Sequence, residues 1–167
     1  VKVSAKYKIS NKLTLGLESE SGKKTDDIGF LQKKDGEIHF GRRDINSVEN
    51  SLDLNFNIDN YKYLSLRFRN FWSTANYDNV LFSLKNDGMR ELTDHSKLDF
   101  DPNTNFNLWN LDLNFDWWFS PGSTITLQYK NQIFNRDNES GLKYYKSLKN
   151  LFEFPVEHQL SLRINYL

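Results

Sequence analysis

Apolar residues occupy every second position in seven segments of the chain, and polar residues fill the positions between them. This period of two is that of a β-strand with one apolar and one polar face. Short turns and long polar segments alternate between the strands, so we expect the short turns at one end of a sheet and the long loops at the other. The pattern predicts strands at residues 1–9, 12–21, 48–58, 63–73, 106–119, 124–134 and 158–167, with long loops at 22–47, 74–105 and 135–156.

The long segments carry local signals of their own. Asp35-Gly36 and the Asn-Asp-Gly run at 86–88 predict tight hairpin turns, so the segment 74–105 is expected to protrude as a ribbon. Between 141 and 153 the apolar residues change to helical spacing, and Pro155 follows. This change of period predicts a short amphipathic helix.

One short turn also predicts a strand register. A turn at Asn60 is expected to place Asp53 opposite Arg69. The same register places Asn55 opposite Arg67, so opposite charges would meet on the polar face. A slip by one residue would send every apolar side chain to the wrong face, so the register should be strongly specified.

Alternation alone does not say whether the apolar face points into a core or out to lipid. Short turns at one end and long loops at the other are typical of outer-membrane barrels and favour lipid. Large aromatic residues also gather near the strand ends, as in the interfacial girdles of such barrels. The expected girdle consists of Tyr61, Tyr63, Trp72, Trp109, Trp117, Phe119 and Tyr166.

The polar rows carry more charge than a solvent-exposed face needs, which favours a wet, networked barrel interior. We expect that interior network to consist of Asp53, Asn55, Arg67, Arg69, Asp112, Asp116 and Lys130. The residues expected to face lipid include Leu52, Phe56, Leu66, Phe115, Leu127 and Leu162. The sequence therefore predicts an all-β fold, an antiparallel up-and-down transmembrane β-barrel with apolar side chains outward and a polar lumen. A soluble antiparallel sandwich or ligand-binding barrel is the alternative.

Single-chain bacterial barrels have an even number of strands, about 8 or more. Seven predicted strands therefore indicate the C-terminal strands of a larger barrel, or one chain of a divided barrel. Composition narrows the partners: the 167 residues hold 22 basic and 22 acidic side chains, and a zero formal charge does not favour nucleic acid. The absence of cysteine excludes disulfides, thiolate metal sites and cysteine nucleophiles.

Candidate catalytic residues are few. His39, His95 and His158 fall in or beside the expected loops, with no pair at metal-ligand spacing. Asp94, His95 and Ser96 have the residue types of a catalytic triad, but adjacent positions cannot form its geometry. We therefore expect no catalytic site, no cofactor and no enzymatic activity.

A calcium site is a weak candidate. Asp99, Asp101 and Asn103 alternate oxygen-bearing side chains, as the first half of a calcium loop does. Thr104 stands where such a loop needs glycine, and Asn110 where it needs a bidentate glutamate. We therefore expect a turn-rich polar loop and no metal.

The Gly-Arg-Arg-Asp run at 41–44 is the most suggestive polar cluster. Arg42 and Arg43, beside Asp44, could hold a phosphate or a sugar carboxylate. Alternatively, this loop tucks into the barrel mouth as a structural plug. Its arginines would then pair with Asp53, Asp112 and Asp116.

Several motifs occur in a fixed order along nearly the whole chain. They lie at 41–44 with 48–51, at 70–73, at 107–118 with 120–123, and at 145–152. Together they resemble the C-terminal barrel of a family of Gram-negative outer-membrane proteins known as a domain of unknown function. The resemblance implies a bacterial outer-membrane location and an upstream part similar to a carbohydrate-binding β-sandwich. It implies no activity.

We therefore expect an outer-membrane β-barrel for passage, capture or docking of glycans or other envelope cargo. Its expected partners are outer-membrane lipid, with other outer-membrane subunits and glycans as further candidates. One alternative is a non-conducting structural or anchoring subunit of a larger outer-membrane complex. The other is a soluble β-barrel that binds a ligand.

Overall fold

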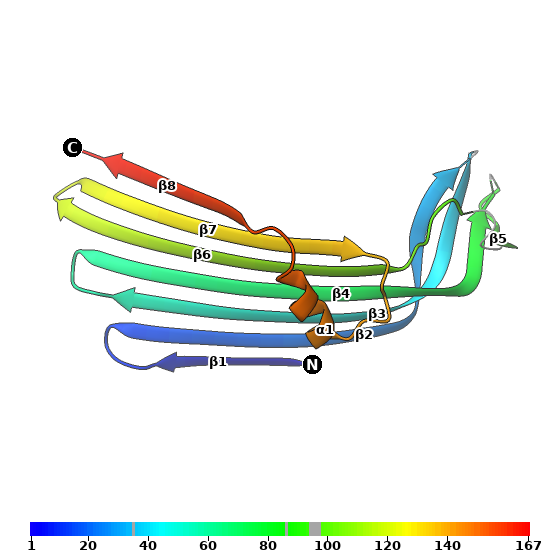
Figure 1. Ribbon diagram of the computed structural model, residues 1–167, viewed down its shortest axis with the longest axis horizontal. Coiled ribbons are helices and arrows are strands. Elements are labelled where there is room, and N and C mark those ends of the chain that lie inside the picture. Colours follow the sequence, from blue (N-terminus) through cyan, green and yellow to red (C-terminus); the bar gives the residue numbers. More distant parts are fainter. Residues whose placement is uncertain (35, 86, 94–97) are drawn as a thin grey trace.

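The computed structural model describes the whole chain except residues 35, 86 and 94–97. The described residues form one antiparallel sheet of eight strands, with one helix on it (Figure 1). The elements are β1 (Lys2–Lys8), β2 (Leu13–Lys34), β3 (Glu37–Asn57), β4 (Lys62–Leu84), β5 (Arg90–Thr93), β6 (Thr104–Ser120), β7 (Ser123–Asp137), α1 (Tyr144–Leu151) and β8 (Glu157–Asn165). Their order in the sheet is β1-β2-β3-β4-β6-β7-β8, and β5 pairs with β4. Apart from β5, the sheet is an up-and-down meander.

The second and third strands extend far beyond their predicted limits. β2 and β3 stay paired as far as Lys34 and Glu37, so the expected loop at 22–47 is strand except at its tip. Apolar alternation fades there, but backbone hydrogen bonds between antiparallel strands need no apolar face. Register shifts bend this hairpin, and Asp26 within it has a φ of 55°.

The other long segments match the local signals more closely. β4 continues to Leu84 and pairs with β5, which confirms the expected ribbon within 74–105 and raises the strand count from seven to eight. Gly36 and Gly88, at the two expected turns, have φ values of 85° and 81°. Asp35 and Asn86 lie outside the described residues. The predicted helix is present as α1.

The register between β3 and β4 differs from the predicted one by two residues. Asp53 lies opposite Arg67 rather than Arg69, and Asn55 lies opposite Ser65. The cause is a tight turn, in which the backbone N–H of residue 58 donates to the carbonyl oxygen of residue 62 at 3.0 Å. A shift of two residues keeps every side chain on its predicted face.

The sheet is a single layer, and no second layer of the described residues packs on most of its apolar face. One cross-strand row runs through Leu15, Leu54, Leu66, Leu113, Tyr129 and Leu160. None of these side chains is buried, and among the described residues only Trp72, Leu81, Ile133 and Leu151 are buried apolar residues. No dry centre therefore forms between this row and a second layer.

The two edges of the sheet lie apart. β1 pairs with β2 and β8 pairs with β7, and the two edge strands run along opposite sides of the sheet (Figure 1). The described residues thus form an open sheet and no closed barrel. Among them, no helix combines the length and apolarity that crossing a membrane requires.

Helix α1 covers the apolar side of the sheet and crosses the long strands about midway along their length (Figure 1). Its first residue, Tyr144, donates a hydrogen bond through its hydroxyl to Asn70 Oδ1 at 2.7 Å. The same hydroxyl accepts one from Asn50 Nδ2 at 2.9 Å. Burial raises the pKa of the Tyr144 phenol, although the hydrogen bond from Asn50 acts in the opposite direction.

A buried network of asparagines lies beneath this helix. Asn105 Oδ1 accepts hydrogen bonds from Ser147 Oγ at 3.1 Å and from Trp72 Nε1 at 3.0 Å. Asn107 Nδ2 donates to Ser147 Oγ at 3.2 Å, and Asn107 Oδ1 accepts from Asn70 at 3.0 Å. We call Asn70, Asn105 and Asn107, each almost fully buried, the asparagine cluster. It holds polar groups on an otherwise apolar face by satisfying them with α1.

Leu151 anchors α1 and is fully buried. We expect Leu151→Ala to destabilise the protein by about 2–5 kcal/mol, because it removes buried methyl groups and leaves a cavity. Urea unfolding of the purified protein measures the change. Leu92→Ala in β5 makes the same deletion at an exposed position and should shift stability by no more than about 0.5 kcal/mol. Equal effects of the two substitutions would contradict the packing of α1.

Candidate functional site

Four charged residues lie directly opposite one another on neighbouring strands. Asp53 on β3 faces Arg67 on β4, and Arg67 also faces Asp112 on β6. Asp112 in turn faces Lys130 on β7. Negative and positive charges therefore alternate across four strands about 4.8 Å apart. We call these four residues the charged row.

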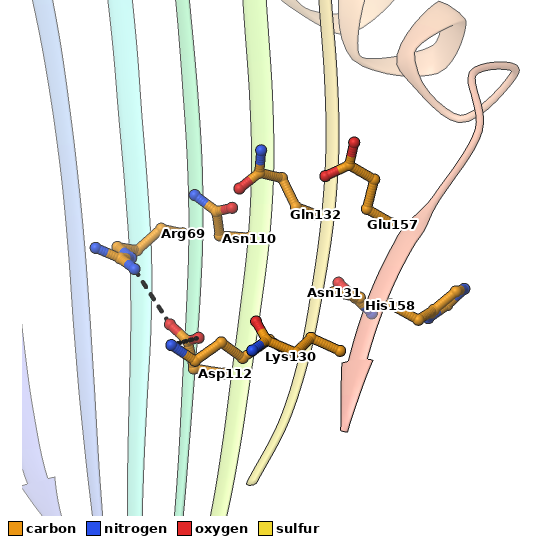
Figure 2. Close-up of a pocket in the computed structure, with 9 residues that line it drawn as sticks. Arg69, Asn110, Asp112, Lys130, Asn131, Gln132, Glu157 and His158 are labelled. Carbon is orange, nitrogen blue, oxygen red and sulfur yellow. Dashed lines mark hydrogen bonds and ion pairs between the residues drawn. The ribbon is translucent and has the colours of Figure 1, made fainter. Parts of the chain in front are cut away.

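Close contacts connect the charged row. Arg67 Nε donates to Asp53 Oδ1 at 2.6 Å, and Arg69 Nη2 donates to Asp112 Oδ2 at 3.1 Å. Lys130 Nζ lies 3.9 Å from Asp112 Oδ1, so Asp112 lies between two cations (Figure 2). The Arg67 side chain is 60% exposed, and such hydrated pairs contribute about 0–1 kcal/mol each. The row therefore contributes little to the stability of the fold, and its main effect is to hold these side chains in position on the polar face.

The rest of the predicted interior network lies on the same face, nearer the short turns. Asp116 accepts a hydrogen bond from Thr126 Oγ1 at 2.6 Å. Asn55 accepts one from the hydroxyl of Tyr63. Tyr63 therefore points to the polar face, so its assignment to the outward aromatic girdle was wrong: it is one residue out of phase with the apolar positions of β4.

Two open hollows indent the polar face around the charged row. One has a volume of about 330 Å³ and is lined by Arg69, Asp112, Lys130, Gln132 and Glu157, among others. Figure 2 shows these side chains projecting from β4, β6, β7 and β8. The second, of about 360 Å³, shares Asp112 and Lys130 and extends to Asp53 and Asn114. Carboxylates, amides and cations line both hollows, so they suit a polar, hydrogen-bonding ligand.

Arg43 organises the polar face closer to the long-loop end. Its Nε donates to Asp27 Oδ2 at 2.8 Å, and its Nη1 donates to the Tyr77 hydroxyl at 2.8 Å. Burial disfavours the charged guanidinium, but the hydrogen bonds to Asp27 and Tyr77 leave the pKa of Arg43 above its ordinary value. Arg43 therefore makes a contact that joins β2, β3 and β4.

Two glycines make room for this contact. Gly29 and Gly41 lie opposite each other on β2 and β3. A Cβ at Gly29 would lie 2.4 Å from the guanidinium carbon of Arg43, and a Cβ at Gly41 would lie 2.7 Å from the ring of Tyr77. The glycine of the motif at 41–44 is thus explained by close packing.

The motif at 41–44 is strand, and this changes its chemistry. Arg42 and Arg43 are consecutive in β3, so their side chains point to opposite faces and cannot hold one anion together. Arg42 Nε donates to Asp78 Oδ2 at 2.6 Å, while Asp44 Oδ1 accepts from the backbone N–H of Asp26 at 3.1 Å. Both hypotheses for this motif, the anion site and the plug, were therefore wrong. The arginines pair with none of the expected carboxylates of Asp53, Asp112 and Asp116.

The calcium candidate does not converge on a common point. Asp99 pairs with Lys34 Nζ at 2.6 Å, and Asp101 Oδ1 accepts from the backbone N–H of Asn103 at 3.0 Å. Asn103 Oδ1 accepts from the backbone N–H of Tyr77 at 2.9 Å. Within the part of the chain that the structure describes, no group of three His, Cys, Asp or Glu residues could hold a metal ion.

Of the candidate catalytic residues, the structure describes His39 and His158. Asp94, His95 and Ser96 lie outside the described residues. His39 was expected in a loop but lies within β3 and is buried. His158, in β8, contacts the hydroxyl of Tyr129 through Nδ1 at 2.8 Å.

Only some rings of the predicted aromatic girdle are exposed at the surface. Trp72 is 6% exposed and packs against Tyr144, so it cannot act as an open interfacial ring: α1 covers it. Trp109 packs between Phe68 and Phe152. Tyr61, Trp117, Phe119 and Tyr166 are exposed near the short-turn end.

Residues 1–167 match the family described as Domain of unknown function (DUF5916). The chain belongs to the DUF5916 family. No curated protein and no solved structure matches it. Membership confirms the resemblance to a domain of unknown function.

Sequence reasoning missed the asparagine cluster and the contacts of Arg43. Asn70 interrupts an apolar row, and Asn105 and Asn107 continue the apolar phase of β6 toward its start. Polar residues on an apolar phase beside a predicted amphipathic helix are the signal that could have found the cluster. Nothing in the sequence pattern indicated that Tyr77 and Asp27 would meet Arg43.

We expect Gly29→Ala to destabilise the protein by about 1–3 kcal/mol, because the new methyl group displaces the Arg43 guanidinium from Asp27 and Tyr77. Urea unfolding measures the loss. Adding Arg43→Ala to Gly29→Ala should cost little more, since the same contact is already gone. Gly16→Ala is the matched control: its Cβ would lie 3.6 Å from Asp53, an ordinary contact. Full additivity of the first two changes would contradict this account.

Proposed function

We propose that the chain forms one side of a β-barrel in a bacterial outer membrane, with its apolar face against lipid and its polar face lining the interior. The observation that supports this proposal is the division of one single-layer sheet into two faces. Among the described residues, no member of the row from Leu15 to Leu160 is buried, whereas the opposite face carries the charged row. A membrane barrel needs this arrangement of faces.

Strand length supports the same proposal. A transmembrane β-strand needs about 9–11 residues when it is tilted by about 45°. β3 has 21 residues and β4 has 23, so each is twice as long as a membrane crossing requires. In this proposal the halves beside the short turns cross the bilayer. The halves with the Arg43 contact and β5 project beyond it.

The unpaired edges must be paired with further strands in such a barrel. Inside hydrocarbon, an unpaired backbone N–H or C=O costs several kcal/mol, because no water is present to bond it. β1 and β8 each pair on one side among the described residues. Strands from elsewhere in the same protein or from a partner subunit would close the barrel.

The cargo of the interior is proposed from its lining. The hollows around Asp112 offer carboxylate, amide and ammonium groups with few apolar surfaces. Glycans present many hydroxyl groups that such donors and acceptors can bind. We therefore propose passage, capture or docking of glycans or similarly polar envelope cargo, without catalysis.

One observation favours the alternative of a non-conducting anchor. The two cations of the charged row, Arg67 and Lys130, already lie within 4.0 Å of carboxylates on neighbouring strands. A network that satisfies itself can also fill a barrel interior. The anchor would then hold partner subunits in the membrane and would conduct nothing.

Phe115 and Asn114 test which face meets lipid. We expect Phe115→Arg to impair membrane insertion by about 2–4 kcal/mol if the site lies near the bilayer midplane, because a cation would enter hydrocarbon. Asn114→Arg, on the adjacent position and opposite face, should be tolerated. Folding into lipid vesicles, monitored by the heat-modifiable mobility shift of folded barrels, measures both. Tolerance of Phe115→Arg would refute the proposed orientation, and recovery of the wild-type protein from cells without detergent would support the soluble alternative.

Conductance separates the pore from the anchor. In planar bilayers, we expect the full-length protein to open single channels whose cation preference decreases in Asp112→Asn, because a carboxylate is removed from the interior. Asp59→Asn, in an exposed turn at the short-turn end, is the control and should leave selectivity nearly unchanged. Silence of the folded, inserted protein would eliminate the pore and favour the anchor.

A further inference from the structure

Helix α1 lies across the strands, where apolar side chains give way to the asparagine cluster (Figure 1). Tyr144 at its start bonds Asn50 on β3 and Asn70 on β4. Phe152, directly after its end, packs against Trp109 on β6 with ring centroids 5.0 Å apart. Asn50 is the register partner of Asn70, and Asn70 is the partner of Trp109. The helix therefore follows one cross-strand row over three strands.

One flank of α1 presents exposed aromatic rings. Tyr145 and Phe152 are seven residues apart, which places them on the same side of a helix. The contact of Phe152 with Trp109 indicates that this side faces the apolar part of the sheet, because Trp109 belongs to the apolar row of β6. Tyr145 is 81% exposed and Phe152 is 52% exposed. Among the described residues, both rings thus lie beside the apolar face and are at least half exposed.

The remaining surface of the helix is basic. Lys143, Lys146 and Lys149 recur every three residues and are exposed. Among the described residues, no carboxylate lies within 4.0 Å of their ammonium groups, and the helix has no acidic residue in its first turn. Glu153, after the helix, is the one acidic residue between 141 and 156. The segment therefore has a local positive charge within a chain of zero formal charge.

We propose that α1 is an interfacial helix that binds the phosphate groups of anionic lipid headgroups through Lys143, Lys146 and Lys149. Tyr145 and Phe152 enter the apolar layer beside it. Helices that lie in a membrane interface combine an apolar flank, aromatic rings and a lysine-rich polar surface. Each cation near an anionic lipid surface strengthens binding. The inference rests on the proposed function, because it requires lipid against the apolar face.

The hydrogen bonds under the helix support its place. Ser147 and Tyr144 tie α1 to Asn107 and Asn70, on the side that faces the sheet. Ser147 and Tyr144 thus bond to the sheet, whereas no carboxylate of the described residues pairs with the three lysines. Charge complementarity therefore points to an anionic partner outside the described protein.

Spin labelling tests the position of the helix. The chain has no cysteine, so in the full-length protein, with any cysteine outside these 167 residues replaced, Tyr145→Cys, Phe115→Cys and Asn114→Cys each give one labelled site. In vesicles of phosphatidylcholine with phosphatidylglycerol, we expect labels at 145 and 115 to be reached by oxygen more than by a water-soluble nickel complex. The label at 114 should show the reverse. If 115 behaves as expected and 145 is fully water-exposed, the helix proposal fails and the barrel proposal survives. If 115 is also water-exposed, the barrel proposal fails as well.

Charge removal tests the ligand. We expect the double variant Lys146→Gln, Lys149→Gln to bind phosphatidylglycerol about 30-fold more weakly in uncharged detergent, measured by native mass spectrometry. Binding of phosphatidylcholine should not change. Lys6→Gln with Lys8→Gln, two exposed lysines of β1, is the matched control and should bind like the wild type. Unchanged binding by the α1 variant, or an equal loss in the control, would overturn the proposal.

Discussion

A single-layer sheet with one apolar face cannot leave that face in water over seven strands. Each leucine or aromatic residue of the row contributes to an area that a protein core would normally remove from solvent. In this chain, α1 covers the part of the face around Trp72. The part around Leu113, nearer the short turns, is not buried by the described residues. Every inference about function depends on what covers that surface. Contiguous apolar patches of this extent mark a binding surface or a membrane surface.

The two halves of the long strands differ in which residues lie on each face and in what these residues contact. Near the short turns, apolar and polar positions alternate, and the negative and positive charges of the charged row balance across the strands. Nearer the long loops, the asparagine cluster occupies positions of the apolar phase. Asparagines on that face would be costly in hydrocarbon, and here Ser147, Tyr144 and Trp72 satisfy them. The change from leucine to asparagine thus marks the level at which α1 begins to cover the face.

The alternation of apolar and polar residues correctly predicted the features that depend on it, namely the strands and the face on which most side chains lie. It assigned the strands near the short turns and placed the members of the charged row on one face, because alternation fixes the face of each residue regardless of the detailed register. It missed the two-residue shift between Asp53 and Arg69, since the alternation is the same in both registers. It also missed the strand character of 22–47, where apolar residues such as Ile28, Phe30, Ile38 and Phe40 occur in short groups separated by polar runs. The misassignment of Arg42 and Arg43 to one anion site followed from that error.

Contacts that need a third element were beyond the sequence pattern. The sequence pattern predicts Trp72 to be an exposed ring at a strand end. In the structure, α1, which lies more than seventy residues later in the chain, covers it. The sequence pattern likewise gives Arg43 no partner, whereas in the structure Asp27 and Tyr77, on two other strands, bond it. In both cases the decisive partner lies far away in the chain, and neither spacing nor composition encodes its position.

The edge strands continue the faces of the sheet. In β1, Val3 and Tyr7 keep the apolar phase and are well exposed, and in β8 Leu160 and Leu162 do the same. Soluble sheets usually protect an edge with bulges, prolines or inward charges. β1 and β8 instead present an unbroken apolar side together with an open row of backbone donors and acceptors. A strand added to either edge could continue both faces without a change of register, and in lipid such an addition would be required to bond the edge. The edges are therefore suited to pairing with further strands, and in the proposed barrel such pairing would also enclose the charged row.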